Sequence, residues 1–125
     1  MGVRLYKEVL WLAPYLQAAR GLVSTRGLTK VMGYQVAADS DEVVYGRLWK
    51  YEDGRRVITV ATRLPDGKRI RFADVLQVFA HELAHLKYWE HTPKHWELEN
   101  KIAARFARVA ERLGVKDTTT RRYVR

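Results

Sequence analysis

His81-Glu82-Leu83-Ala84-His85-Leu86-Lys87-Tyr88-Trp89-Glu90-His91 contains three of the chain's four histidines. On a helix, His81 and His85 are one turn apart on the same face, so their side chains can share one metal ion. Imidazole nitrogens suit zinc, and Glu82 is placed to hold a zinc-bound water without itself binding the metal. The segment therefore predicts a helix that carries a zinc site, with Glu82 as the general base of a hydrolytic reaction.

A zinc ion held by two imidazoles needs a third protein ligand. His91 follows His85 by six residues and would point away from the metal if the helix continued. His91 can therefore be the third ligand only if the helix ends near Trp89 and a tight turn brings it back. The pair Thr92-Pro93 favours such an end, because proline disfavours a helical conformation in the residue before it.

Three side chains after His91 have alternative roles. Glu97 or Glu99, on the next predicted helix, could replace His91 as the third ligand. Glu99 otherwise lies close to the predicted buried stripe, where it could be the partner of a ligating histidine. His95 could stabilise the oxyanion of a tetrahedral intermediate, but we expect it to be an exposed residue of the first helical turn with no such role.

Two helices are predicted around this segment. The first is capped by Asp74 and runs to about Tyr88 or Trp89; it is apolar on most of its circumference, so we expect it to be buried between a sheet and another element. The second starts at Thr92-Pro93 and stops at Gly114. Its predicted apolar stripe consists of Trp96, Ala103, Phe106, Ala110 and Leu113.

Short strands are predicted in the middle of the chain. Residues 43–51 are rich in β-branched and aromatic side chains, and Asp53-Gly54 predicts a hairpin turn into a return strand over residues 56–64. Residues 68–72 alternate basic and apolar side chains like a short edge strand, and residues 34–37 form a weaker strand. These segments predict an antiparallel meander of three to four strands. Its aromatic side chains at period two, Tyr45, Trp49 and Tyr51, are expected in the core.

The remaining segments complete a prediction of a single α+β domain over residues 1–125. Apolar residues at three- and four-residue spacing predict a helix over residues 4–20, closed by Gly21 and kinked or broken at Pro14. A loop is expected over residues 21–33. Residues 115–125 are expected to be a basic tail with little to bury.

Composition excludes several classes of site and partner. Because the chain has no cysteine, a disulfide framework, a Cys-ligated zinc ribbon, an iron–sulfur site and a thiol nucleophile are excluded. The 23 basic and 14 acidic residues leave a net charge of +9, which favours contact with DNA, RNA or another polyanion, or else a solvated basic surface. Without an 18-residue apolar run or a signal peptide, we expect no membrane span and a cytoplasmic location.

The histidine segment resembles the signature of YgjP-like metallopeptidases, which are relatives of the SprT-like and WLM-type proteases. Those proteins carry His-Glu-Leu-x-His-Leu, then Asn-His-Ser, then Phe-Trp; this chain has His-Glu-Leu-Ala-His-Leu-Lys, then His91-Thr92-Pro93-Lys94-His95-Trp96. The resemblance is tight over residues 79–98. It implies a small zincin-like fold in which Zn²⁺ is bound by His81, His85 and His91 and in which Glu82 is the general base.

The resemblance is incomplete at three positions. Glu90 stands where the family usually has Asn, Thr92 replaces Ser, and His95 replaces Phe before Trp96. We also expect the chain to be trimmed to the catalytic core, without the zinc ribbon or DNA-binding appendages of some relatives.

Three functions follow from these features. The first is a zinc metallopeptidase that hydrolyses peptides or proteins, including nucleic-acid-associated ones. The second is a metal-dependent endoribonuclease of the YbeY type, which shares the His-x3-His-x5-His spacing but carries Gly where this chain has Glu82. The third is a non-catalytic, zinc-stabilised nucleic-acid-binding module whose fourth ligand is Glu90, Glu97 or Glu99. The oligomeric state does not follow from the sequence.

Overall fold

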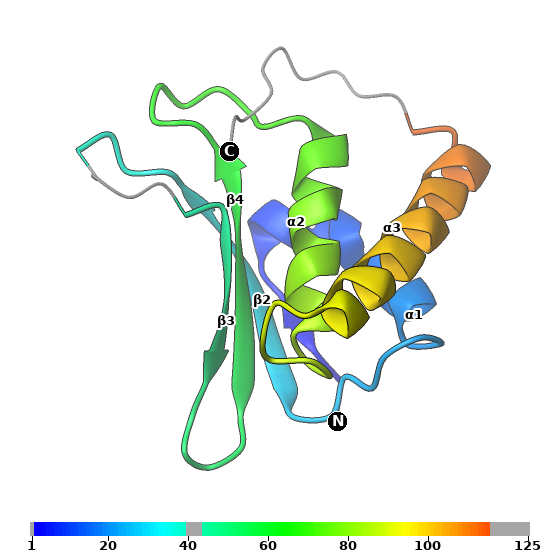
Figure 1. Cartoon of the computed structure of the whole chain (residues 1–125). Coiled ribbons are helices and arrows are strands. Elements are labelled where there is room, and N and C mark those ends of the chain that lie inside the picture. Colours follow the sequence, from blue (N-terminus) through cyan, green and yellow to red (C-terminus); the bar gives the residue numbers. More distant parts are fainter. Residues whose placement is uncertain (1, 40–43, 116–125) are drawn as a thin grey trace.

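The computed structural model describes residues 2–39 and 44–115 and has the predicted α+β architecture (Figure 1). Its strands are β1 (Arg4–Leu5), β2 (Leu28–Gln35), β3 (Gly46–Lys50) and β4 (Arg56–Arg63), and its helices are the 3-10 helix η1 (Lys7–Leu12), α1 (Ala13–Ala19), α2 (Phe72–Ala84) and α3 (Pro93–Leu113). Residues 116–125 of the predicted basic tail lie outside the described residues. Within the described ranges, no helix combines the length and the apolar character that crossing a bilayer requires.

The four strands form one mixed sheet in the order β1-β2-β4-β3. The predicted hairpin is confirmed, since β3 pairs with β4 in antiparallel register. The expectation of an antiparallel meander is wrong for the rest of the sheet, because β2 pairs with β4 in parallel and β1 pairs with β2 in parallel. After β2 the chain forms β3 at the outer edge of the sheet and then returns as β4, which lies between β2 and β3. Strand periodicity does not reveal this order.

The predicted edge strand over residues 68–72 is also wrong. This segment contributes only an isolated bridge between Arg63 and Arg69. The segment is short because it lies between a turn and a helix. Gly67, with a positive φ of 85°, ends the preceding turn, and α2 begins at Phe72. The edge of the sheet beside α2 is instead β3.

The N-terminal segment differs from the predicted single helix over residues 4–20. Arg4–Leu5 is a strand, η1 follows with a non-helical residue at Val9, and α1 begins at Ala13. Pro14 lies in the first turn of α1, where its missing N–H breaks no helical hydrogen bond. The predicted loop over residues 21–33 is too long, since β2 starts at Leu28. Of the weaker strand predicted over residues 34–37, only residues 34–35 belong to β2.

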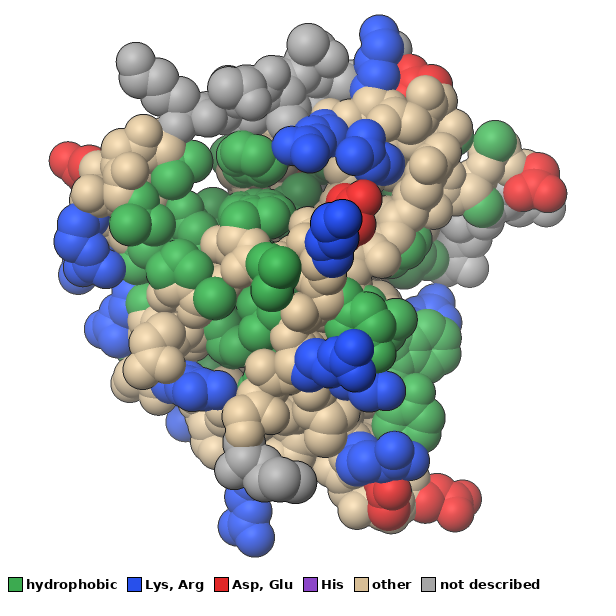
Figure 2. Space-filling view, turned by 180° about the vertical axis from the view of Figure 1, so that it is seen from behind, with side chains coloured by type: hydrophobic (Ala, Val, Ile, Leu, Met, Phe, Trp, Pro, Cys, Tyr) green, Lys and Arg blue, Asp and Glu red, His purple; other side chains and the backbone are tan. Residues whose placement is uncertain are grey.

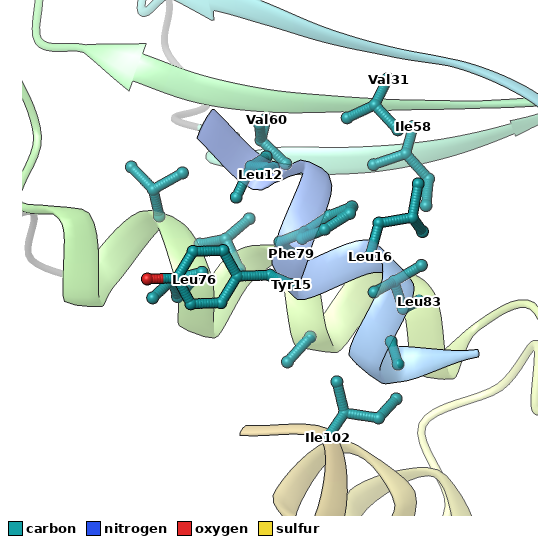
Figure 3. Close-up of a cluster of buried hydrophobic side chains, with 14 of the residues drawn as sticks. Leu12, Tyr15, Leu16, Val31, Ile58, Val60, Leu76, Phe79, Leu83 and Ile102 are labelled. Atoms are coloured by element: carbon teal, nitrogen blue, oxygen red, sulfur yellow. The ribbon is translucent and has the colours of Figure 1, made fainter. Parts of the chain in front are cut away.

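The helices cover one face of the sheet, and α2 lies between the sheet and α3 (Figure 1). Figure 3 shows the side chains that meet around α2: Leu12, Tyr15 and Leu16 from the N-terminal helices, Val31, Ile58 and Val60 from the sheet, Leu76, Phe79 and Leu83 from α2, and Ile102 from α3. The Phe79 ring stacks on Phe106 of α3 with centroids 5.8 Å apart. The predicted burial of this helix is therefore confirmed, and its packing holds the histidine segment in place.

Helix α3 begins and ends as predicted but presents a different face. Thr92 accepts a hydrogen bond from His95 N at the start, and Gly114 ends the helix with a φ of 67°. The predicted stripe is wrong at both ends, because Trp96 is 63% exposed and Leu113 is 52% exposed. The buried positions are His95, Leu98, Glu99, Ile102, Phe106 and Val109. The polar side chains of His95 and Glu99 are thus buried against α2. Helix α3 is therefore rotated about its axis relative to the prediction.

The sheet face opposite the helices is only partly covered. Trp49 and Tyr51, expected in the core, are 42% and 48% exposed, and Tyr45 is half-buried. Trp49 Nε1 donates a hydrogen bond to Thr59 Oγ1 on the neighbouring strand at 3.1 Å. Trp49 and Tyr51 are therefore largely exposed to solvent, whereas the half-buried Tyr45 packs against the core.

Candidate metal centre

The three histidines of the opening segment come from the end of α2 and the turn after it. His81 lies in the last turn of α2, and His85 directly follows the helix in a helical conformation (φ −65°, ψ −18°). The helix itself ends at Ala84, earlier than the predicted end near Trp89. The following turn is tied to the sheet, since Arg56 Nη1 donates to Leu86 O at 3.2 Å. The helix thus ends before His91 and is followed by a turn, which is what the sequence requires if His91 is to be the third ligand.

The Nε2 atoms of His81, His85 and His91 form a triangle. All three Nε2–Nε2 distances are 3.1 Å. A tetrahedral zinc site with Zn–N bonds of 2.0–2.1 Å has nitrogen atoms about 3.3 Å apart. The spacing of the three donors thus fits a single metal ion.

The hydrogen bonds on the other side of the rings set the tautomers. His81 Nδ1 lies 2.6 Å from Glu99 Oε1, and His85 Nδ1 lies 3.0 Å from Tyr88 O. Since a carboxylate and a carbonyl only accept, each Nδ1 carries the proton, and in a neutral ring each Nε2 then presents a lone pair. Two lone pairs that face each other at 3.1 Å repel unless a cation lies between them. The three histidines could therefore hold a metal ion.

A second group, His81, His95 and Glu99, could also hold a metal ion. Its polar atoms are, however, already bonded: Glu99 Oε2 accepts from Gln77 Nε2 at 2.7 Å, and His95 Nε2 donates to His81 O at 3.1 Å. The Nε2 triangle lacks such hydrogen-bond complementarity and is the better metal site. Glu99, considered from sequence as a third ligand, contacts the rear nitrogen of His81 instead.

The structure also bears on the sequence-based expectations for His95 and Glu97 of α3. His95, expected to be exposed, is only 2% exposed and contacts His81. Glu97 is exposed and belongs to neither candidate metal group. The spacing of His95, Glu99, Ile102 and Phe106 is itself a helical stripe, and this alternative phase could have indicated that His95 is buried.

Glu82 is buried beside the triangle, at 6% exposure. It lines one cavity with the three histidines; the other lining residues are Gly46, Arg47, Leu48, Trp89 and Glu90. A Cβ atom at Gly46 would lie 2.4 Å from Val78 Cγ1 and 3.1 Å from Glu82 Oε2. Only glycine therefore lets β3 approach α2 closely enough to lie against Glu82.

Burial and local hydrogen bonds set the charges around the triangle. Burial lowers the pKa of His85 to about 4, against the opposing effect of its bond to Tyr88 O. Burial also lowers the pKa of His95. For Glu99, burial acts to raise the pKa, but hydrogen bonds from His81 and Gln77 and the charge of His81 outweigh it, and the pKa is lowered. At neutral pH the His85 ring is thus neutral, as a metal ligand must be.

The low pKa of His85 predicts that the metal-free protein loses stability in mild acid. Between pH 6.5 and about 4 the unfolded chain binds a proton at His85 and the folded chain does not, so the stabilisation is complete above pH 6.5 and falls towards pH 4. The expected loss in unfolding free energy is on the order of 2–3 kcal/mol. Urea unfolding in EDTA across this pH range measures it. A His85→Gln variant should show a shallower pH dependence, and an equal slope would contradict the assignment.

The Glu99 contact predicts an effect on metal affinity. Glu99 holds the proton on His81 Nδ1 and orients the ring, so Glu99→Ala should weaken metal binding by about 10- to 100-fold. Competition titration with a chromogenic chelator measures the affinity, and Glu97→Ala, on the exposed side of the same helix, is the matched control. If the two variants bind metal equally well, Glu99 does not support the site.

No protein-family model, curated protein or solved structure matches this chain. The chemistry of the site is therefore inferred from its own residues. The metallopeptidase family and activity implied by the resemblance of residues 79–98 stay predictions.

Proposed function

We propose that this protein is a zinc-dependent metallopeptidase. The observation that carries the proposal is the juxtaposition of the Nε2 triangle and the buried Glu82 carboxylate in one cavity. Within residues 2–39 and 44–115, no carboxylate joins the triangle to make a four-ligand group. This arrangement of three protein ligands and an open side is typical of catalytic rather than structural zinc.

The three imidazole donors favour zinc over magnesium or calcium, which prefer oxygen ligands. A zinc ion bound there would lower the pKa of its water ligand and polarise the scissile carbonyl. Glu82 would take the proton of the attacking water and pass it to the leaving amine. Because Glu82 directly follows His81 on α2 and His85 is the C-cap of that helix, one continuous segment orients the base and two of the ligands.

The outer edge of β3 is the proposed place for the substrate backbone. β3 is the last strand of the sheet, and its residues Gly46, Arg47 and Leu48 line the cavity of the metal centre. A peptide in extended conformation can pair with such an edge. Residues 68–72, which the sequence predicted as an edge strand, form only an isolated bridge.

A nucleic-acid-associated substrate is a further part of this proposal. Lys50 and Arg47 lie close to the cavity, with Lys50 Nζ 4.2 Å from the centroid of Trp89. On the face opposite to the view of Figure 1, Lys and Arg side chains are spread over the surface rather than gathered in one patch (Figure 2). Retention on immobilised DNA at low salt that is lost at high salt would support this part; the absence of retention would remove it. The cytoplasmic location stays a prediction.

The proposed function is tested with parallel digests of casein and of a structured RNA. The expected result is casein cleavage that a chelator abolishes and added Zn²⁺ restores, with the RNA intact. Chelator-sensitive RNA cleavage without casein cleavage would instead favour the endoribonuclease. A protein that binds zinc stoichiometrically and cleaves neither, together with a broad peptide library left intact, would favour the non-catalytic module.

A further inference from the structure

His95 makes a hydrogen bond to the backbone of α2 at His81, the first of the candidate ligands. It lies in the first turn of α3 and is 2% exposed, and its Nε2 donates to His81 O at 3.1 Å. The carbonyl groups of a final helical turn lack complete helical partners. His81 O also accepts a long bond of 3.3 Å from His85 N, where the helix ends. His95 thus secures the end of α2 at the residue that presents the first ligand.

The His95 ring also packs on the two ligand rings at the end of α2, His81 and its C-cap residue His85. Its centroid is 4.0 Å from that of His85, with the ring planes tilted by 30°, and 4.7 Å from that of His81 in an edge-on contact. One buried side chain therefore limits the rotation of both imidazoles. Neither contact uses the Nε2 atoms of His81 and His85, which remain directed at the triangle.

A third set of contacts connects His95 to the remaining candidate ligand. Its backbone N–H donates to Thr92 Oγ1 at 3.4 Å, and Thr92 directly follows His91. The His91 ring also meets the His95 ring edge-on, with centroids 5.4 Å apart. His95 is thereby in contact with all three imidazoles of the triangle.

We infer that His95 is a positioning residue of the metal centre, which holds the three ligand rings in register through its hydrogen bond to His81 O and its packing on His85. The inference rests on the proposed metal site. It extends that proposal by assigning a role to α3, which supplies no ligand to the triangle. Since metal donors must be placed to within about 0.5 Å, loss of such a support weakens binding without removing any ligand.

Two substitutions separate the two contacts of His95. His95→Phe keeps an aromatic ring against His85 but cannot donate to His81 O. His95→Gln can place an amide N–H near His81 O but has no ring. His95→Ala removes both contacts. Trp96→Ala is the matched control, because it removes an exposed aromatic ring from the same turn of α3.

The test is titration of the metal-free variants with Co²⁺, which replaces zinc and whose visible absorption reports coordination geometry. We expect His95→Ala to bind Co²⁺ about 10- to 100-fold more weakly than the wild type, with altered absorption per bound ion. His95→Phe and His95→Gln should lie between the two, and Trp96→Ala should match the wild type. Circular dichroism of the metal-free proteins checks folding; if His95→Ala is unfolded, the comparison of His95→Phe with the wild type decides.

Two results would overturn the inference in different ways. Folded His95 variants that bind Co²⁺ with wild-type affinity and spectrum would show that the residue only fills space. A wild-type protein that binds neither Co²⁺ nor Zn²⁺ would overturn the metal centre itself, and with it the proposed function. The wild-type titration alone therefore distinguishes the two failures.

Discussion

Replacing Glu82 by Gln is expected to reduce peptide hydrolysis by about 10²- to 10⁴-fold while the protein keeps its metal. The carboxylate is buried next to the Nε2 triangle but belongs to neither group of candidate ligands. Glutamine has the same shape and cannot accept the proton of the attacking water, so the substitution removes the base and leaves the three imidazoles in place. The rate of cleavage of a fluorogenic peptide and the zinc content per chain are the two measurements.

The control for this experiment is Glu97→Gln, which makes the same chemical change at an exposed position outside the cavity. It should cleave peptide at the wild-type rate. Full activity of Glu82→Gln would refute the general-base mechanism. Loss of zinc from Glu82→Gln would instead place this carboxylate among the ligands and require a different base.

Replacing His91 by Ala is expected to weaken zinc binding by more than about 100-fold, since it removes one donor of three. His91 is exposed and lies in the turn between α2 and α3, so the substitution should leave the fold intact. Metal content after dialysis against a weak chelator, with the circular dichroism spectrum beside it, measures both effects.

The same measurement on Glu99→Ala and Glu97→Ala orders the alternatives that the sequence left open. We expect the largest loss for His91→Ala, a smaller loss for Glu99→Ala because it contacts the rear of His81, and no loss for Glu97→Ala. If His91→Ala retains its zinc while Glu99→Ala loses it, the second group of residues, which contains Glu99, is the metal site and the Nε2 triangle is not.

The expectations that were confirmed concern segments whose pattern is local. The hairpin at Asp53-Gly54 and the start of α3 at Thr92-Pro93 depend on a few adjacent residues, and both are present in the structure. The expectations that were wrong concern relations between distant segments. The parallel pairing of β2 with β4 joins residues about thirty positions apart, and no periodicity within either strand indicates its partner.

The prediction of which face of α3 is buried was wrong for a related reason. An apolar stripe through Trp96 and a mixed stripe through His95 and Glu99 are both helical patterns, and hydrophobicity favours the first. The second is buried because His95 and Glu99 find hydrogen-bond partners on α2. A buried polar side chain is stable only when such partners exist, and their existence depends on tertiary packing.

By itself, the sequence determined the α+β class, the buried helix and the pairing of His81 with His85, because a spacing of four residues places two side chains on one helical face whatever surrounds them. The tertiary structure alone decided that His91 completes the triangle, that Glu99 and His95 contact His81 from α3, and that Glu82 lies against the bare backbone of Gly46. These contacts join a helix end, a turn, a second helix and an edge strand. Their geometry depends on how the elements pack together, which no short-range pattern encodes.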